Sequence, residues 1–269
     1  MTRERWAGTA AGWEEHADAF RARTMPVSSW LVAAIAPQPG HTVLDLAAGI
    51  GDTGFLAAEL IEPGGTLITS DFAPEMLSAA QRRAERLGLR NVRFRQINAS
   101  QPMDLEAASL DAVLCRWGYM LMDDAETAMR ETRRVLRPGG RLALAAWTEA
   151  GDNRWSPLPM AMLVDRGAIE PSEPGPGQFA WGPDGVIAEH LDNAGFVEYD
   201  IEAIEFPMRY ESVREWWETT RAMSRFAAQA RIDDEAEWLD ALAREAADWT
   251  GADGSLSIPA RTWVATGTA

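Results

Sequence analysis

The chain has 269 residues, of which 46% are hydrophobic, which is enough to bury the core of one elaborated α/β domain or of two small domains. Its formal net charge of −16 argues against a nucleic-acid partner and against an anionic membrane surface, because both attract basic proteins. No apolar run is long enough to span a membrane and no signal peptide is evident, so the sequence predicts a cytoplasmic protein.

Two residue types that often carry chemistry are scarce. Lysine is absent, which excludes Schiff-base chemistry, a pyridoxal anchor and a P-loop. The single cysteine, Cys115, excludes an internal disulfide and a cysteine-built zinc site, and its position is typical of an inert, buried strand residue. Glu15, His16 and Asp18 would not share one helix face, so no metal site is predicted.

Residues 1–36 are predicted to be helical, because Trp6, Trp13, Phe20 and Trp30 recur at mainly helical spacing. Strands and helices then alternate through residues 37–150, which predicts a doubly wound parallel sheet with its ligand at the carboxyl ends of the strands. The predicted strands are 41–46, 66–70, 92–97, 111–115 and the stretch that follows the Pro138-Gly139-Gly140 turn. The helices between them are marked by Pro74, Gly88, and Asp123 or Asp124.

Residues 151–269 are predicted to complete the sheet. A helix at 159–169, a loop rich in Pro and Gly at 170–185 and a helix at 184–194 precede a sixth strand, 196–206, and a seventh strand at 255–266 closes the chain. Between these two strands, about 208–250 is predicted to be a helical insertion, because Val213, Trp216, Trp217, Thr220, Met223 and Phe226 share one face.

Residues 43–54 read Val-Leu-Asp-Leu-Ala-Ala-Gly-Ile-Gly-Asp-Thr-Gly, which fits the G-x-G-x-x-G turn of nucleotide-binding folds. A nicotinamide dehydrogenase needs the amides of this turn for an anionic pyrophosphate, which the carboxylate of Asp45 would repel. Asp45 instead suits a cofactor that carries a cationic or amine-bearing end near the glycines. S-adenosylmethionine has an amino group, a sulfonium and no phosphate.

At this point the sequence resembles the class I (seven-stranded) S-adenosylmethionine-dependent methyltransferases, most of all their quinone-biosynthesis and small-molecule branch. The resemblance covers roughly residues 40–147 in correct order, including Arg134-Val-Leu-Arg-Pro-Gly-Gly-Arg-Leu-Ala-Leu144. It implies an α/β fold with a doubly wound, mostly parallel, seven-stranded sheet of the Rossmann-like type, an antiparallel last strand and a helical cap. It makes 37–150 the cofactor-binding core.

The resemblance also implies a set of cofactor contacts. Asp71, at the end of the second strand, grips the ribose hydroxyls, and Asn98 stands where most members carry Asp toward the adenine amine. Arg116 contributes its backbone, and its side chain is expected to face an acidic partner or an anionic acceptor group. The full predicted set is Asp45, Ala47, Gly49, Gly51, Asp71, Phe72, Met76, Asn98, Ala99 and Arg116.

In this family, N-terminal helices and insertions before the last strand often form a lid over the acceptor. The chain has 12 tryptophans, many of them in these regions, and an aromatic wall suits a flat or apolar acceptor. The predicted acceptor contacts are Trp13, Trp117, Tyr119 and Trp216. The alternative is that these rings merely hold the lid helices to the sheet.

The predicted function is methyl transfer to oxygen or carbon of a small, apolar or aromatic acceptor. His16 is the candidate general base if the acceptor is a hydroxyl, since His41 lies away from the ligand edge and His190 is expected to be solvated on a helix. Otherwise positioning alone suffices. Altered chemistry such as decarboxylation or cyclisation, a nicotinamide oxidoreductase and a non-enzymatic binding module are the alternatives, and a homodimer is left open.

Overall fold

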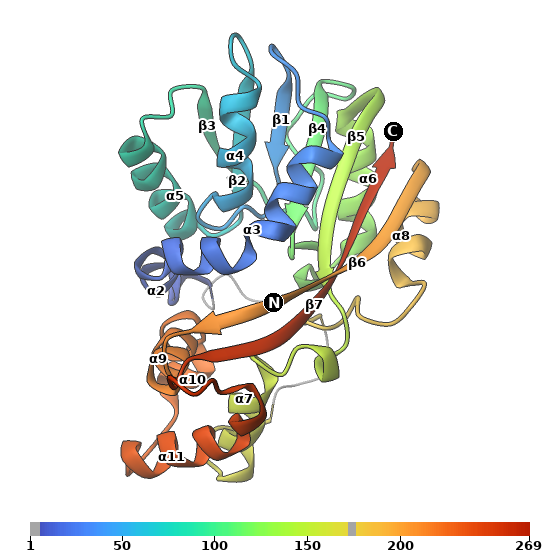
Figure 1. Ribbon diagram of the computed structural model, residues 1–269. Helices are drawn as coiled ribbons and strands as arrows, with labels where there is room; N and C mark the ends of the chain where they lie inside the picture. The colour runs from blue at the N-terminus through green and yellow to red at the C-terminus, as the bar shows by residue number, and fades with distance from the viewer. Residues whose placement is uncertain (1–5, 172–175) are drawn as a thin grey trace.

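A seven-stranded sheet runs through the computed structural model in the order β3-β2-β1-β4-β5-β7-β6 (Figure 1). The structure describes residues 6–171 and 176–269. Strands β1 to β5 pair in parallel, and β7 is antiparallel to both β5 and β6. The predicted sheet is therefore confirmed. The strands are β1 (Thr42–Asp45), β2 (Thr66–Asp71), β3 (Val92–Gln96), β4 (Leu110–Arg116), β5 (Leu136–Trp147), β6 (Val197–Tyr210) and β7 (Leu256–Thr268).

The strand order changes direction at β1, which has β2 on one side and β4 on the other. Asp45, the last residue of β1, is level with Thr69 of β2 and Leu114 of β4. Loops that leave neighbouring strands on opposite faces open a crevice at such a point, where ligands of this sheet type bind. The fold thus places Asp45 at the centre of the ligand-binding edge.

Helices cover both faces of the sheet, and their ends follow the predicted signals. Pro74 occupies the first turn of α5, and Gly88 ends that helix in the left-handed conformation at φ 69°. The carboxylate of Asp124 accepts a hydrogen bond from the backbone N–H of Thr127 and caps α6. The core helices are α4 (Asp52–Leu60), α5 (Pro74–Leu87), α6 (Ala125–Val135) and α8 (Val186–Ala194).

The N-terminal helices α2 (Ala10–Glu15) and α3 (Ala17–Ala34) lie at the carboxyl ends of the strands and beside the sheet (Figure 1). Helix α2 contacts both α5 of the core and α9 (Val213–Met223) of the cap, and α3 packs on α4 and on β4 to β7. The cap helices are α7 (Pro157–Asp165), α9 (Val213–Met223), α10 (Arg225–Gln229) and α11 (Glu235–Glu245). Short 3₁₀ turns are η1 (Tyr119–Leu121), η2 (Ala150–Asp152) and η3 (Ala247–Trp249).

The second half differs from the sequence prediction in detail. Strand β6 continues to Tyr210, which pairs with Leu256, because buried and exposed side chains keep alternating beyond the predicted end at 206. The helical insertion is broken twice, at Ser224 and Asp234, whose side chains cap α10 and α11. Helix α7 ends at Asp165, four residues before the predicted end at 169.

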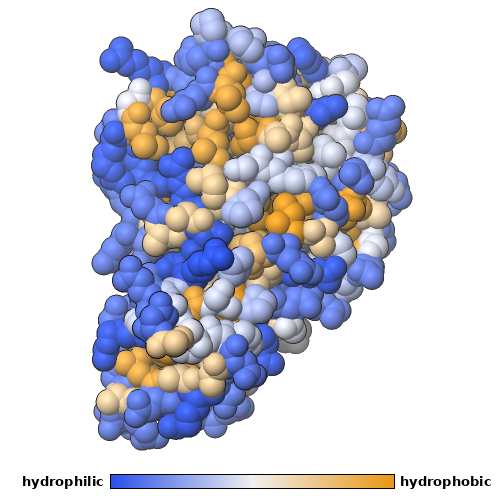
Figure 2. Space-filling view, viewed as in Figure 1, coloured by the Kyte–Doolittle hydropathy of each residue, from blue (hydrophilic) through white to orange (hydrophobic). Residues whose placement is uncertain are grey.

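The surface in Figure 2 is mainly hydrophilic, with apolar side chains in small patches and not in one broad band. Large exposed hydrophobic side chains are found at Leu60, Leu87 and Val197. Within the described residues, no helix has the length and apolar character needed to cross a membrane.

Candidate functional site

The glycine turn follows β1 at the centre of the ligand-binding edge. Gly49 and Gly51 have φ values of +56° and +87°, which favour glycine. A Cβ on Gly51 would lie 2.4 Å from the ring of Phe55, whereas a Cβ on Gly49 would meet nothing within 4 Å. The turn is therefore closed toward α4 and open beside Gly49, where a ligand can approach the backbone.

Asp71 ends β2 beside this turn. Its Oδ2 accepts a hydrogen bond from the N–H of Gly49 at 3.0 Å, and its Oδ1 accepts one from the N–H of Ala73 at 2.9 Å. Burial raises the pKa of Asp71 to about 6. A carboxylate has about four acceptor positions, so two hydroxyl donors can still bind it. These features suit the predicted contact with a ribose.

Asp45 lies beneath the turn and is 1% exposed. Its Oδ2 accepts a hydrogen bond from the N–H of Gly54 at 2.8 Å, and burial raises its pKa to about 7. A Cβ on Gly54 would approach this oxygen to 2.5 Å, which explains the third glycine. Because Asp45 occupies an amide in the first turn of α4, that helix start is poorly suited to a pyrophosphate.

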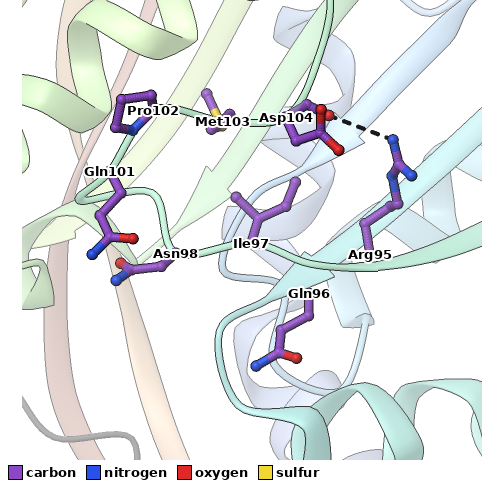
Figure 3. A pocket seen from close by; sticks show the side chains of 8 residues that line it. All are labelled: Arg95, Gln96, Ile97, Asn98, Gln101, Pro102, Met103 and Asp104. Atoms are coloured by element: carbon purple, nitrogen blue, oxygen red, sulfur yellow. Dashed lines mark hydrogen bonds between the residues drawn. The ribbon is translucent and has the colours of Figure 1, made fainter.

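The remaining predicted cofactor contacts surround the ends of β2 and β3. Met76 and Ala99 are buried, and Phe72 packs against the apolar cluster that contains Met76. The side chain of Asn98 lies in a hollow of about 210 Å³, where its amide points toward that of Gln101 (Figure 3). Ala47 is half-buried in the turn itself. Two carboxylates that can accept hydrogen bonds, an apolar surface and an exposed amide together fit S-adenosylmethionine.

The side chain of Arg116 faces Asp52, as an acidic partner was predicted. Its Nη2 donates to Oδ2 of Asp52 at 3.1 Å, and its Nη1 donates to the hydroxyls of Thr24 and Ser28 on α3. Sequence reasoning did not single out Asp52, although it follows Gly51 directly. Its position suggested only an acid at a helix start.

A row of aromatic rings leads from the N-terminal helices past the end of β4 to the cap. Ring centroids are 5.1 Å apart for Trp13 and Phe20, 6.1 Å for Phe20 and Trp117, and 5.2 Å for Trp147 and Trp155. Trp117 and Trp147 stack at 4.2 Å with an interplanar angle of 11°. Trp13 and Trp117 were predicted acceptor contacts and Trp155 was one of the tryptophans of the predicted lid regions, whereas Phe20 and Trp147 were not predicted here.

Trp117 is held unusually firmly. It has φ +59°, a conformation that costs a bulky residue energy and that concentrates at functional sites. Its Nε1 donates to the hydroxyl of Thr262 on β7 at 2.9 Å. The surrounding contacts therefore fix the ring at the carboxyl end of β4.

Tyr119 and Trp216 lie in the interior. The Tyr119 hydroxyl is 2.6 Å from that of Thr132 on α6, and its ring stacks on Trp181. Trp216 is 0% exposed, and its Nε1 donates to the backbone carbonyl of Trp155. Their acceptor contacts stay predictions.

The three histidines differ in surroundings. His16 is half-buried at the junction of α2 and α3. His190 was expected to be solvated, which is wrong: its ring stacks on Trp181 at 4.3 Å, and burial lowers its pKa. No group of three potential metal ligands occurs in the described part of the chain. Cys115 is buried, and burial raises the pKa of its thiol.

Residues 27–150 match the ubiE/COQ5 methyltransferase family. The nocamycin O-methyltransferase of Saccharothrix syringae is 32% identical over 185 residues, which cover 64% of this chain and 65% of that protein. A demethylmenaquinone methyltransferase of Thermus thermophilus is 41% identical over 102 residues, 38% of this chain and 45% of that protein. The chain thus spans less than two thirds of either relative. The crystal structure of YcgJ from Bacillus subtilis superposes with a TM-score of 0.63 at 20% identity and covers 90% of this chain and 97% of that chain.

Proposed function

Because residues 27–150 form the core of a class I S-adenosylmethionine-dependent methyltransferase near the quinone-biosynthesis branch, we propose that this chain methylates a small, apolar or aromatic acceptor at oxygen or carbon. One observation carries the proposal. Two buried carboxylates, Asp45 and Asp71, flank the open glycine turn, and the aromatic row passes Trp117 at the end of the adjacent strand β4.

In this proposal the chain holds the adenosine half of the cofactor at β2 and β3. Asp71 accepts from both ribose hydroxyls, and the amide oxygen of Asn98 accepts from the adenine amine. Phe72 and Met76 supply the apolar shelf on which the base lies. Asp45 supplies negative potential beneath the turn, on the side where the amino group and the sulfonium bind.

When bound, the cofactor supplies an electrophilic methyl carbon, and the work left to the protein is positioning in a dry site. Such positioning can lower a barrier by about 7–11 kcal/mol. The rings of Phe20, Trp117 and Trp147 are each less than one tenth exposed, so they exclude water. If the acceptor is a hydroxyl, His16 is the group proposed to take its proton, because it lies in the N-terminal lid.

The names of two relatives and two properties of this chain support the small-molecule acceptor. One curated relative is named as an O-methyltransferase and another as a demethylmenaquinone methyltransferase. The names point to methyl transfer onto a molecule other than a nucleic acid, and the aromatic rings of the row suit an apolar one. The acidic chain, with a net charge of −16, does not suit a nucleic-acid acceptor.

The test combines a binding measurement with a transfer measurement. We expect S-adenosylhomocysteine to raise the thermal unfolding midpoint, whereas NAD should leave it unchanged. We then expect label from methyl-labelled S-adenosylmethionine to appear in at least one member of a panel of phenols and hydroquinones. Stabilisation by NAD alone would contradict the cofactor assignment. A product formed from an acceptor without uptake of label would indicate the altered chemistry instead.

A further inference from the structure

We infer that Arg116 and Asp52 are positioning residues, which join the lid helix α3 to the glycine turn and fix Trp117 at the edge of the proposed acceptor site. Only the identity of the molecule that binds at this site rests on the proposed function. The contacts themselves connect four separate elements, α3, α4, α5 and the end of β4.

Asp52 is the centre of the arrangement. It directly follows Gly51, and its side chain is 1% exposed. Oδ1 accepts from Nη1 of Arg83 on α5 at 2.5 Å, and Oδ2 accepts from Nη2 of Arg116 at 3.1 Å. Arg83 also donates to the backbone carbonyl of Ile50, inside the turn, at 3.1 Å. A buried carboxylate with two arginines is costly to disrupt, so it holds the turn rigidly.

Arg116 extends this network to the lid. Its Nη1 donates to the hydroxyl of Thr24 at 2.8 Å and to that of Ser28 at 2.9 Å. These residues are four apart, so both hydroxyls lie on one face of α3, and both are almost fully buried. Ser28 is also 3.2 Å from the hydroxyl of Thr53 on α4. The buried hydroxyl groups of α3 therefore find hydrogen-bond partners in Arg116 and in α4.

The same guanidinium lies over Trp117, with its central carbon 4.8 Å from the ring centroid. The ring of Trp147 is stacked against Trp117 at 4.2 Å and covers one face. The guanidinium must then occupy the other face, so Trp117 is held between a cation and a second indole. Its left-handed backbone conformation is retained by contacts on both sides.

One side chain thus joins the lid, the cofactor turn and the aromatic wall. A lysine at position 116 would keep the charge but lose the planar fork that reaches three partners. A ligand that binds at the glycine turn should therefore change the hydrogen exchange of α3 and the environment of Trp117. This coupling should require the planar guanidinium of residue 116 and the carboxylate of Asp52.

The test uses Arg116→Lys and Asp52→Asn in the full chain, with hydrogen exchange of residues 17–34 and near-ultraviolet circular dichroism as readouts. In wild type, S-adenosylhomocysteine should slow exchange in α3 by tenfold or more. Both variants should lose this slowing and change the tryptophan signal. Rescue of both readouts by Arg116→Lys would overturn the inference, because a point charge would then be enough.

Arg82→Gln is the matched control. Arg82 joins α5 to Glu14 of α2, so it also links core and lid, but it is an exposed pair. This variant should behave as wild type, and a loss of α3 protection equal to that in Arg116→Lys would contradict the assignment to Arg116.

If Asp52→Asn does not fold, the double variant Thr24→Val and Ser28→Ala replaces it. That variant removes only the lid contacts, so α3 should exchange faster, while unchanged exchange would overturn the inference.

Failure of the proposed function gives a different pattern. If wild type does not bind S-adenosylhomocysteine, the cofactor assignment fails. The positioning role is then tested by the hydrogen exchange of α3 and by the tryptophan signal, both measured without ligand. Faster exchange in Arg116→Lys than in Arg82→Gln would still support it.

Discussion

Gly12 of α2 lies directly against the backbone of Ala222 in α9. A Cβ on Gly12 would be 2.0 Å from the carbonyl oxygen of Ala222, closer than any real contact allows. Helix α2 also contacts α5 of the core, so the N-terminal helices bridge the core and the cap. Helices α2 and α9 can approach this closely only because Gly12 has no side chain where they cross.

We predict that Gly12→Ala separates α2 from α9, because a backbone carbonyl cannot move as a flexible side chain can. The variant should stay folded, bind S-adenosylhomocysteine within a few-fold of wild type, and lose most methyl transfer. A Cβ on Gly139 would also meet open space, but the positive φ of that residue would strain an alanine. Gly151→Ala, which has open space around it and no positive φ, is therefore the matched control. Unchanged transfer in Gly12→Ala would show that the bridge is dispensable.

The lid as a whole can be tested by deletion. Residues 2–24 include 2–5, which lie outside the described residues, all of α2 and the first part of α3 as far as Thr24. Their removal should reduce transfer or acceptor binding far more than cofactor affinity, because the glycine turn and Asp71 belong to the core. The measurement compares turnover with the calorimetric affinity for S-adenosylhomocysteine. Equal losses in both would mean that the helices only stabilise the fold.

The raised pKa values of Asp45, about 7, and Asp71, about 6, predict how stability depends on pH. Burial makes the folded state hold these protons more tightly than the unfolded chain does. Their contribution to stability is therefore present below the unfolded pKa, about 4, and is lost as pH rises through the folded values. Each pKa unit corresponds to about 1.4 kcal/mol.

Urea unfolding at about pH 5 and about pH 8 checks this expectation. The loss of unfolding free energy toward pH 8 should be smaller in Asp45→Asn than in wild type. Affinity for S-adenosylhomocysteine should change in the opposite direction and rise with pH, because ionised carboxylates accept its donors better. Identical pH profiles for wild type and Asp45→Asn would contradict the pKa assignment.

The role of His16 is tested by the rate of methyl transfer against pH for wild type and His16→Gln. If His16 takes the proton of a hydroxyl acceptor, the variant should lose about a hundredfold in rate and the acidic limb of the profile, since general bases typically contribute 10²–10⁴-fold. An unchanged rate and profile would indicate a site that works by proximity alone.

Local patterns were sufficient to predict the strands β1 to β5, because each has an apolar run or, in β3, an alternation of apolar and charged side chains, next to glycine or proline punctuation. The same signals placed Asp45 and the glycine turn at one edge, and the family resemblance added Asp71. The pairing of Arg116 with Asp52 was not predictable, since it joins residues 64 apart that only the tertiary fold brings together. Likewise, helical spacing places Trp216 on an apolar face, but spacing does not distinguish a wall of a site from the interior of a cap.

The assignment of the cofactor depends most on Asp71. Calorimetric titration of wild type, Asp71→Ala and Asp240→Ala with S-adenosylhomocysteine measures its contribution, Asp240 being an exposed carboxylate on α11. Hydrogen bonds to a charged group contribute roughly 1.5–3 kcal/mol each, so Asp71→Ala should bind at least tenfold more weakly. We expect wild type and Asp240→Ala to bind equally and Asp71→Ala alone to lose affinity. Unchanged affinity in a folded Asp71→Ala protein, or no binding by wild type, would contradict it.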